Sequence, residues 1–173
     1  MNRRNAIKTL MMTSGGIFAL PAWAHAWKPD EMAKFNTTFT DQEIDLISAI
    51  ADTIIPSNGE IGALSVGIDK FLVGLISRCY EEKFRGEVRM NLHALNEQSI
   101  TSYQKGFAEA GKMDRENLLL SLSSSADDND VSFFEFMKQQ TIRGFETSEE
   151  VLVHYHGYVM MPGFYNGNVD VEA

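Results

Sequence analysis

The strongest constraint on the fold is a succession of apolar residues at helical spacing between positions 40 and 145. Five segments carry this spacing, and none alternates apolar and polar residues as a half-buried strand does. The first begins with Thr40 and Glu43, the spacing of a capping box that satisfies two helical backbone donors. We therefore predict an all-α, compact single-domain helical bundle of about five helices. The positions expected to face its core include Ile44, Ile47, Ala51, Ile54, Ile68, Phe71, Leu72, Leu75, Ile76, Val88, Leu92, Leu95, Tyr103, Leu118, Leu119, Leu122, Phe133, Phe134, Met137 and Thr141.

The first helix is expected to stop at Pro56, and the second is expected within 63–82. Gly67 and Gly74 fall inside the second segment, where glycine costs about 1 kcal/mol relative to alanine. We expect close packing against another helix to explain them. Cys79 falls on the apolar stripe and is expected to be a buried small side chain.

The third helical pattern lies between 84 and 110, and a break is expected near Ser99. Asp114 is expected to cap a fourth helix after a turn. The fifth helix is expected at 131–145, after a polar loop that can supply its N-cap, with Gly144 marking the start of its end.

The N-terminal segment has the pattern of an export signal. Arg3, Arg4 and Lys8 are followed by an apolar run of about twelve residues, which is shorter than the roughly twenty that a transmembrane helix needs. An arginine pair ahead of a weakly hydrophobic run favours the twin-arginine (Tat) route. An ordinary Sec signal with two adjacent arginines is the alternative.

Ala22 and Ala24 form a small-x-small cleavage site, so the export signal is assigned to 1–24. Cleavage there would leave 149 of the 173 residues, an ordinary size for one domain. The signal holds three of the fifteen basic residues and no acidic residue, so its removal changes the net charge from −9 to −12. Such an acidic surface disfavours nucleic acid and anionic lipid as direct partners.

Three further regions follow the signal: an extended arm at 25–39, the helical body at 40–145 and a C-terminal tail at 146–173. The tail is irregular, rich in aromatic residues and methionine, and contains Pro-Gly and Asn-Gly turn pairs. Aromatic residues and methionine are enriched at the centres of protein interfaces. We therefore predict that the tail faces a partner.

The sequence contains no nucleotide-binding glycine motif, nucleophile elbow or zinc-protease motif. His154 and His156 form the one close histidine pair, and on an extended segment both would point to the same face. A zinc site needs three or four ligands, and no further histidine or cysteine lies nearby. We therefore expect no catalytic, cofactor-binding or metal-binding residue in this chain.

Three blocks of the sequence resemble the gluconate 2-dehydrogenase subunit 3 family. The first is ADTIIP at 51–56 with GA at 62–63, which resembles the family's A-D-x-I-I-P opening. The second, GFETSE at 144–149, is similar to its G-[FY]-x-T-S-E segment. The third, YVMMPGFYNG at 158–167, is similar to its closing Y-x-x-x-P-G-x-[FY]-x-G. The blocks have the family's order and spacing over nearly all of the chain that follows the signal.

The sequence departs from the family pattern at two places. Members often have a glycine soon after T-S-E, where this chain has Glu150 and Val151. They often have a cysteine after the final glycine, where this chain has Asn168, so no bridge or interfacial thiol is expected there.

The resemblance implies a non-catalytic small subunit that binds a large FAD-dependent dehydrogenase of the glucose–methanol–choline (GMC) type. The large subunit would hold FAD and oxidise a sugar, sugar acid or polyol, and electrons would commonly pass to a cytochrome c subunit. The small subunit would supply the signal peptide and help the large subunit to fold. The expected location is the periplasm, reached by the Tat route, with membrane association only through the complex.

Contacts with the large subunit are expected from the arm and the tail. The residues are Trp27, Phe35, Phe145, Thr147, Ser148, Tyr158, Met160, Met161, Pro162, Gly163, Phe164 and Tyr165. The alternative for most of them is a place in the chain's own core. Two other readings of the whole chain stay open: a free-standing exported module that binds a ligand or protein, and an enzyme with an unrecognised site around His154, His156 and Glu149.

Overall fold

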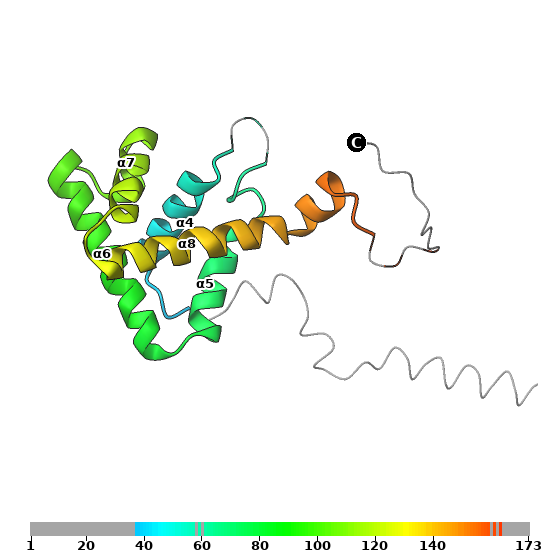
Figure 1. Cartoon of the computed structure of the whole chain (residues 1–173), viewed down its shortest axis with the longest axis horizontal. Helices are drawn as coiled ribbons and strands as arrows, with labels where there is room; N and C mark the ends of the chain where they lie inside the picture. Colours follow the sequence, from blue (N-terminus) through cyan, green and yellow to red (C-terminus); the bar gives the residue numbers. More distant parts are fainter. Residues whose placement is uncertain (1–36, 58, 60, 160, 162, 164–173) are drawn as a thin grey trace, which may run out of the picture. The chain divides into compact units, whose positions relative to one another are not determined.

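A computed structural model of the chain describes residues 37–57, 59, 61–159, 161 and 163 (Figure 1). All of these described residues belong to one compact unit. The predictions for the signal, most of the arm and part of the tail concern residues outside the described ones. These residues are Arg3, Arg4, Lys8, Ala22, Ala24, Trp27, Phe35, Met160, Pro162, Phe164 and Tyr165.

Five α-helices and two short helical turns build the described unit (Figure 1). They are α4 (Asp41–Ile54), α5 (Ile68–Cys79), α6 (Glu82–Tyr103), the 3-10 turn η1 (Phe107–Glu109), α7 (Lys112–Ser123), α8 (Asp128–Glu146) and the π-helical turn η2 (Val151–Tyr155). None of the residues that the structure describes is in a β-strand, and the prediction of an all-α helical fold is confirmed.

Helix α4 lies at the centre and contacts α5, α6, η1, α7 and α8. Its start follows from the capping box, in which Thr40 Oγ1 accepts a hydrogen bond from the Glu43 N–H and the Glu43 carboxylate accepts one from the Thr40 N–H. Because helices surround α4, more of it is buried than the predicted face: Leu46 and Ile50 are buried, while Ile44 is only half-buried.

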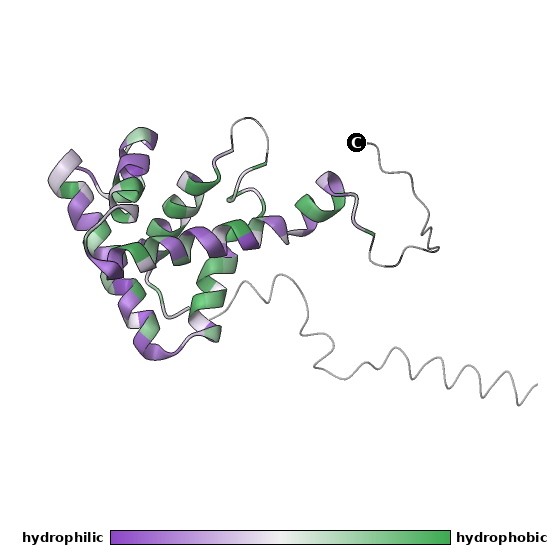
Figure 2. Ribbon diagram, viewed as in Figure 1, coloured by the Kyte–Doolittle hydropathy of each residue, from purple (hydrophilic) through white to green (hydrophobic). Residues whose placement is uncertain are grey.

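The core gathers apolar side chains from every helix and from η1. Its largest fully buried apolar members are Phe107, Ile47, Ile50, Ile68, Leu72, Ile76, Leu92, Leu95 and Met137. Hydrophobic residues are prominent along α4 and α5, whereas α6 carries many hydrophilic ones (Figure 2). A single buried face is what an amphipathic outer helix requires.

Helix α5 differs from its prediction in three respects. It begins at Ile68, because Gly67 adopts a left-handed conformation (φ 74°) that ends the preceding turn. A Cβ on Gly67 or Gly74 would meet no atom within 4 Å, so close helix packing does not explain either glycine. Cys79 is exposed, because the last turn of α5 extends past the core.

The other helix boundaries also differ in places. Helix α6 is unbroken, and Ser99, where a break was expected, is fully buried inside it. Helix α7 begins after Gly111 and places Asp114 in its first turn rather than at its cap. Helix α8 begins at Asp128, because Asp127 caps it by accepting a hydrogen bond from the Asn129 N–H (2.9 Å). It ends at Glu146, one residue after the predicted end and two after Gly144.

Candidate partner-binding surface

Gly144, in the last turn of α8 as expected, also marks a close contact between two helices. A Cβ on Gly144 would lie 2.7 Å from Phe71 Cδ1 and 3.4 Å from Ile68 Cδ1, and both of these residues belong to α5. A side chain at 144 would therefore force the Phe71 ring to move. The glycine of the second sequence block thus lets the last turns of α8 pack directly on α5.

Asp52 of the first block joins α4 to α7. Its Oδ2 lies 3.0 Å from Arg115 Nη2, and Arg115 Nη1 also donates to the Ala49 carbonyl oxygen (3.4 Å). The Arg115 side chain is 15% exposed and the Asp52 side chain 31%, so the pair is partly shielded from water. Its role is to hold two helices together.

The turn after the first block folds back on the end of α4. The Ala63 N–H donates to the Ile55 carbonyl oxygen (2.9 Å), and Ala63 is fully buried. A Cβ on Gly62 would lie 2.5 Å from the Ser57 nitrogen, so only glycine fits there. Ser65 Oγ donates to the Gly62 carbonyl oxygen (2.7 Å) and accepts from its N–H (2.9 Å).

The second block terminates α8 through its hydroxyl groups. Thr147 Oγ1 donates to the Arg143 carbonyl oxygen and Ser148 Oγ to the Phe145 carbonyl oxygen, each at 2.7 Å. The last carbonyl groups of a helix have no partner within the helix. Here the Arg143 and Phe145 carbonyl oxygens accept the backbone N–H groups of Thr147 and Ser148 (3.1 Å each), and the two hydroxyl groups add a second donor to each oxygen.

The turn at 61–66 and the segment at 148–154 enclose an open groove of about 560 Å³, which we call the loop–tail groove. Its lining residues are Ile61, Ser65, Val66, Ser148, Glu149, Glu150, Val153 and His154. Residues from the second block and from the turn that holds Gly62 and Ala63 therefore share one surface, although they lie more than 80 positions apart in the sequence.

The predicted contact residues within the described ranges fall into two groups. Phe145 is half-buried and packs against the core of this chain, and Ser148 is half-buried in the groove wall. Thr147, Tyr158, Met161 and Gly163 are exposed. Their contact with a partner stays a prediction.

Sequence reasoning missed part of this surface. Leu64, Val153, Tyr155 and Val159 are also exposed, with 44%, 45%, 57% and 62% of their surface accessible. The sequence signal for these tail residues was the apolar run that begins at Val151. Which of its side chains are buried, such as Val151, and which are exposed, such as Val153, depends on the helical turn η2.

His154 and His156 do not lie on an extended segment, so the condition under which both would point to the same face is not met. His154 belongs to η2, and its Nε2 lies 3.8 Å from Glu150 Oε2, with both side chains more than half exposed. Nowhere in the described ranges do three or more His, Cys, Asp or Glu side chains group as metal ligands would.

A buried carboxylate anchors the start of α4. Glu43 is 3% exposed, and its Oε1 lies 3.5 Å from Arg89 Nε and 3.3 Å from His93 Nε2 on α6. Burial alone would raise the Glu43 pKa, but hydrogen bonds from Thr40, the positive charge of Arg89 and a hydrogen bond from His93 together lower it. The Arg89 guanidinium also lies 5.5 Å from the centre of the Phe39 ring. The carboxylate thus holds the chain before α4 against α6.

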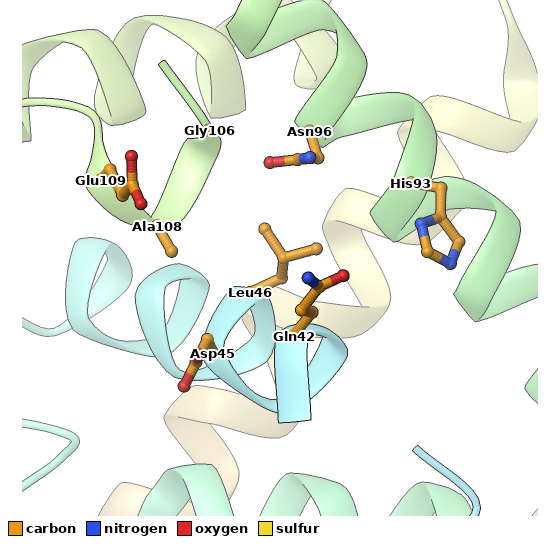
Figure 3. Close-up of a pocket in the computed structure, with 8 residues that line it drawn as sticks. All are labelled: Gln42, Asp45, Leu46, His93, Asn96, Gly106, Ala108 and Glu109. Carbon is orange, nitrogen blue, oxygen red and sulfur yellow. The ribbon is translucent and has the colours of Figure 1, made fainter. Parts of the chain in front are cut away.

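A second pocket, of about 270 Å³, lies between α4, α6 and η1 (Figure 3). Its lining residues are Gln42, Asp45, Leu46, His93, Asn96, Gly106, Ala108 and Glu109. Two of its polar groups already serve the fold: Asn96 Oδ1 accepts from the Phe107 N–H (3.0 Å), and His93 contacts Glu43. The arrangement keeps η1, and with it the buried Phe107 side chain, in place.

A search for membrane-spanning helices, confined to the described part of the chain, finds none of sufficient length and apolar character.

Comparison with known proteins identifies one family. The model of that family, described as gluconate 2-dehydrogenase subunit 3, matches residues 41–163, from the first residue of α4 into the third sequence block. The chain is also 45% identical over 64 residues to ribonuclease PH from Synechococcus sp. (strain JA-3-3Ab). That similarity covers 37% of this chain and 26% of the ribonuclease, so the chain spans only about a quarter of that relative. No solved structure matches. The family match confirms the resemblance seen in the three blocks: the chain belongs to the gluconate 2-dehydrogenase subunit 3 family, a family of small subunits of a dehydrogenase complex.

Proposed function

We propose that this chain is the non-catalytic small subunit of a periplasmic FAD-dependent dehydrogenase of the GMC type. It assists folding of the large flavoprotein subunit and exports it through the Tat route. The complex oxidises a sugar, sugar acid or polyol, its FAD is bound by the large subunit, and a cytochrome c subunit accepts the electrons. The observation that carries this proposal is the family match over residues 41–163.

Residues of the first two sequence blocks have structural roles in the fold, which supports a non-catalytic subunit. Asp52 binds Arg115, Gly144 lets α8 approach α5, and Thr147 ends a helix. These residues shape a surface instead of presenting reactive groups. The exposed apolar residues beside that surface are of the kind that a partner covers.

Purification of the tagged full-length chain from cells that also produce the large subunit tests the proposal. We expect a flavoprotein to co-purify in a fixed ratio and to show the absorption of bound FAD. A stable monomer that retains no flavoprotein would instead support a free-standing binding module. Metal in the purified chain that is lost in a His154→Ala/His156→Ala variant would support an enzyme.

Export is tested separately with an Arg3→Lys/Arg4→Lys variant, which preserves charge but removes the arginine pair. We expect both subunits to remain in the cytoplasm, measured by cell fractionation and dehydrogenase activity in the periplasm. A Lys8→Arg variant is the matched control and should export normally. A large subunit that reaches the periplasm in the Arg3→Lys/Arg4→Lys variant would show that the signal serves this chain alone.

A further inference from the structure

We propose that the loop–tail groove is the docking site for a segment of the large subunit that carries an apolar side chain next to a lysine or arginine. The inference rests on the proposed function and specifies where and by what chemistry the two subunits meet.

The groove has a mixed lining, with three apolar residues beside five polar ones, and walls that the fold holds in place. Ile61 and Val66 come from the turn before α5, and Val153 comes from η2. The first wall is fixed by the two Ser65 hydrogen bonds to Gly62. The second is fixed by Ser148, whose hydroxyl group binds the end of α8. A groove that is formed before binding loses little conformational entropy when a partner enters.

Exposed apolar residues continue from the groove along the described part of the tail. Tyr155, Tyr158, Val159 and Met161 expose 57%, 53%, 62% and 83% of their surface, although each is large and apolar or aromatic. Such a concentration in one short segment marks an interaction site more often than scattered apolar residues do. Because this segment follows Val153 and His154 of the groove in the sequence, we include it in the proposed docking surface.

The negative charge of the groove favours a partner segment with a basic side chain. Glu149 and Glu150 are exposed on one wall, and His154 is the one basic residue among those that line the groove. His154 already lies 3.8 Å from Glu150, so Glu149 keeps no basic neighbour in the lining. A partner with a lysine or arginine gains from the negative charge of the two glutamates, and the aliphatic stem of either side chain suits the apolar lining residues Ile61, Val66 and Val153.

The same argument disfavours a second copy of this chain, which has a net charge of −9. Like charges placed against each other across an interface oppose association. A self-made dimer is therefore an outcome that the experiment must detect.

Binding of the full-length chain to the purified large subunit tests the proposal through a Glu149→Lys/Glu150→Lys variant. We expect the dissociation constant to rise by about tenfold or more, because attraction becomes repulsion. The matched control is Glu97→Lys/Glu109→Lys, which changes the net charge equally at exposed residues of α6 and η1. The control should change the dissociation constant by less than about twofold.

Two further variants separate the components of the surface. Glu149→Gln/Glu150→Gln should weaken binding less than charge reversal, and should reduce the loss of affinity that the native chain shows when salt is raised from about 0.05 M to about 0.5 M. Val153→Ser should weaken binding without changing that salt dependence. Circular dichroism of each variant confirms that the helices are intact.

The outcomes distinguish this inference from the proposed function. If the native chain binds no flavoprotein, the proposed function fails. If it binds and charge reversal weakens binding no more than the control does, the docking site is wrong while the function stands. If sedimentation shows a native dimer that only the Glu149→Lys/Glu150→Lys variant dissociates, the occupant is a second copy and the proposal is overturned.

Discussion

Replacement of Glu43 measures how much the contacts of its carboxylate, which join the start of α4 to Arg89 and His93 of α6, contribute to the free energy of unfolding. Three interactions stabilise the ionised side chain: hydrogen bonds from Thr40 to Oε2 (2.7 and 2.9 Å), the Arg89 ion pair and the His93 contact. Glu43→Ala removes all of them and leaves Arg89 without its carboxylate. Glu43→Gln keeps an acceptor for the Thr40 N–H, since glutamine also completes a capping box, but removes the charge.

The expected loss of stability follows from the exposure of each partner. A buried hydrogen bond to a charged group contributes about 1.5–3 kcal/mol. The Arg89 side chain is 33% exposed, so its pair contributes about 0.5–1 kcal/mol, and the His93 side chain, at 62% exposed, adds little. We therefore expect Glu43→Ala to lower the free energy of unfolding by about 3 kcal/mol, or Tm by about 6–12 °C. Glu43→Gln should cost about 1 kcal/mol.

The effect of Glu43 also depends on pH, and its sign is determined by the lowered pKa. A carboxyl group whose folded pKa is below its ordinary value of 4.5 stabilises the fold while it is ionised. That contribution is complete above the unfolded pKa and disappears as the pH falls through the folded pKa. The stability difference between the native chain and Glu43→Gln should therefore be constant above about pH 6 and shrink toward zero as the pH falls below about 4.

Urea unfolding followed by circular dichroism, repeated from neutral to acidic pH, gives these free energies. Glu87→Gln is a suitable control, because Glu87 pairs with Lys83 at 3.8 Å on the surface of α6 and should contribute less than about 0.5 kcal/mol. A Glu43→Ala loss no larger than that of the control would refute the reasoning. A Glu43→Gln difference that persists unchanged at low pH would refute the assignment of the stabilisation to the ionised carboxylate.

Two further predictions concern the helix contacts. Gly86→Ala should stabilise the chain by about 0.5–1 kcal/mol, because a Cβ there meets open space, whereas Gly144→Ala should lack this gain because it displaces Phe71. Equal stabilisation in urea unfolding would contradict the close contact between α5 and α8. Asp52→Asn and Arg115→Gln should show a coupling energy of about 0.5–1 kcal/mol in a double-mutant cycle, and a coupling near zero would show that the pair does not hold α4 to α7.

The parts of the fold that could be read from the sequence depend on local chemistry. The Thr40–Glu43 capping box is a contact between residues three positions apart, so its spacing alone predicts it. Helical periodicity likewise predicted five helices, because the period of a helix is independent of its neighbours. The family blocks were visible for the same reason: each is a short, continuous stretch.

The errors arose where a local signal competes with tertiary packing. The end of α8 near Gly144 was predicted to within one residue, but the reason for a glycine there was not, because it lies in the contact with Phe71 of α5. Ser99 suggested a break, but the surrounding helices bury it inside an unbroken α6. Cys79 fits an apolar stripe, and it is exposed because the core ends before the last turn of α5.

The sequence by itself determined the helical class, the order of the helices and the family, because these depend on periodicity, caps and continuous motifs. Only the tertiary structure decided that the turn at 61–66 and the segment at 148–154 share a groove. The two segments lie close because Gly144 lets α8 pack on α5. Hydrogen bonds from the Thr147 and Ser148 hydroxyl groups hold the end of α8 beside the second segment. Contacts between residues so far apart in the sequence have no local signature, since they are fixed by the packing of whole helices.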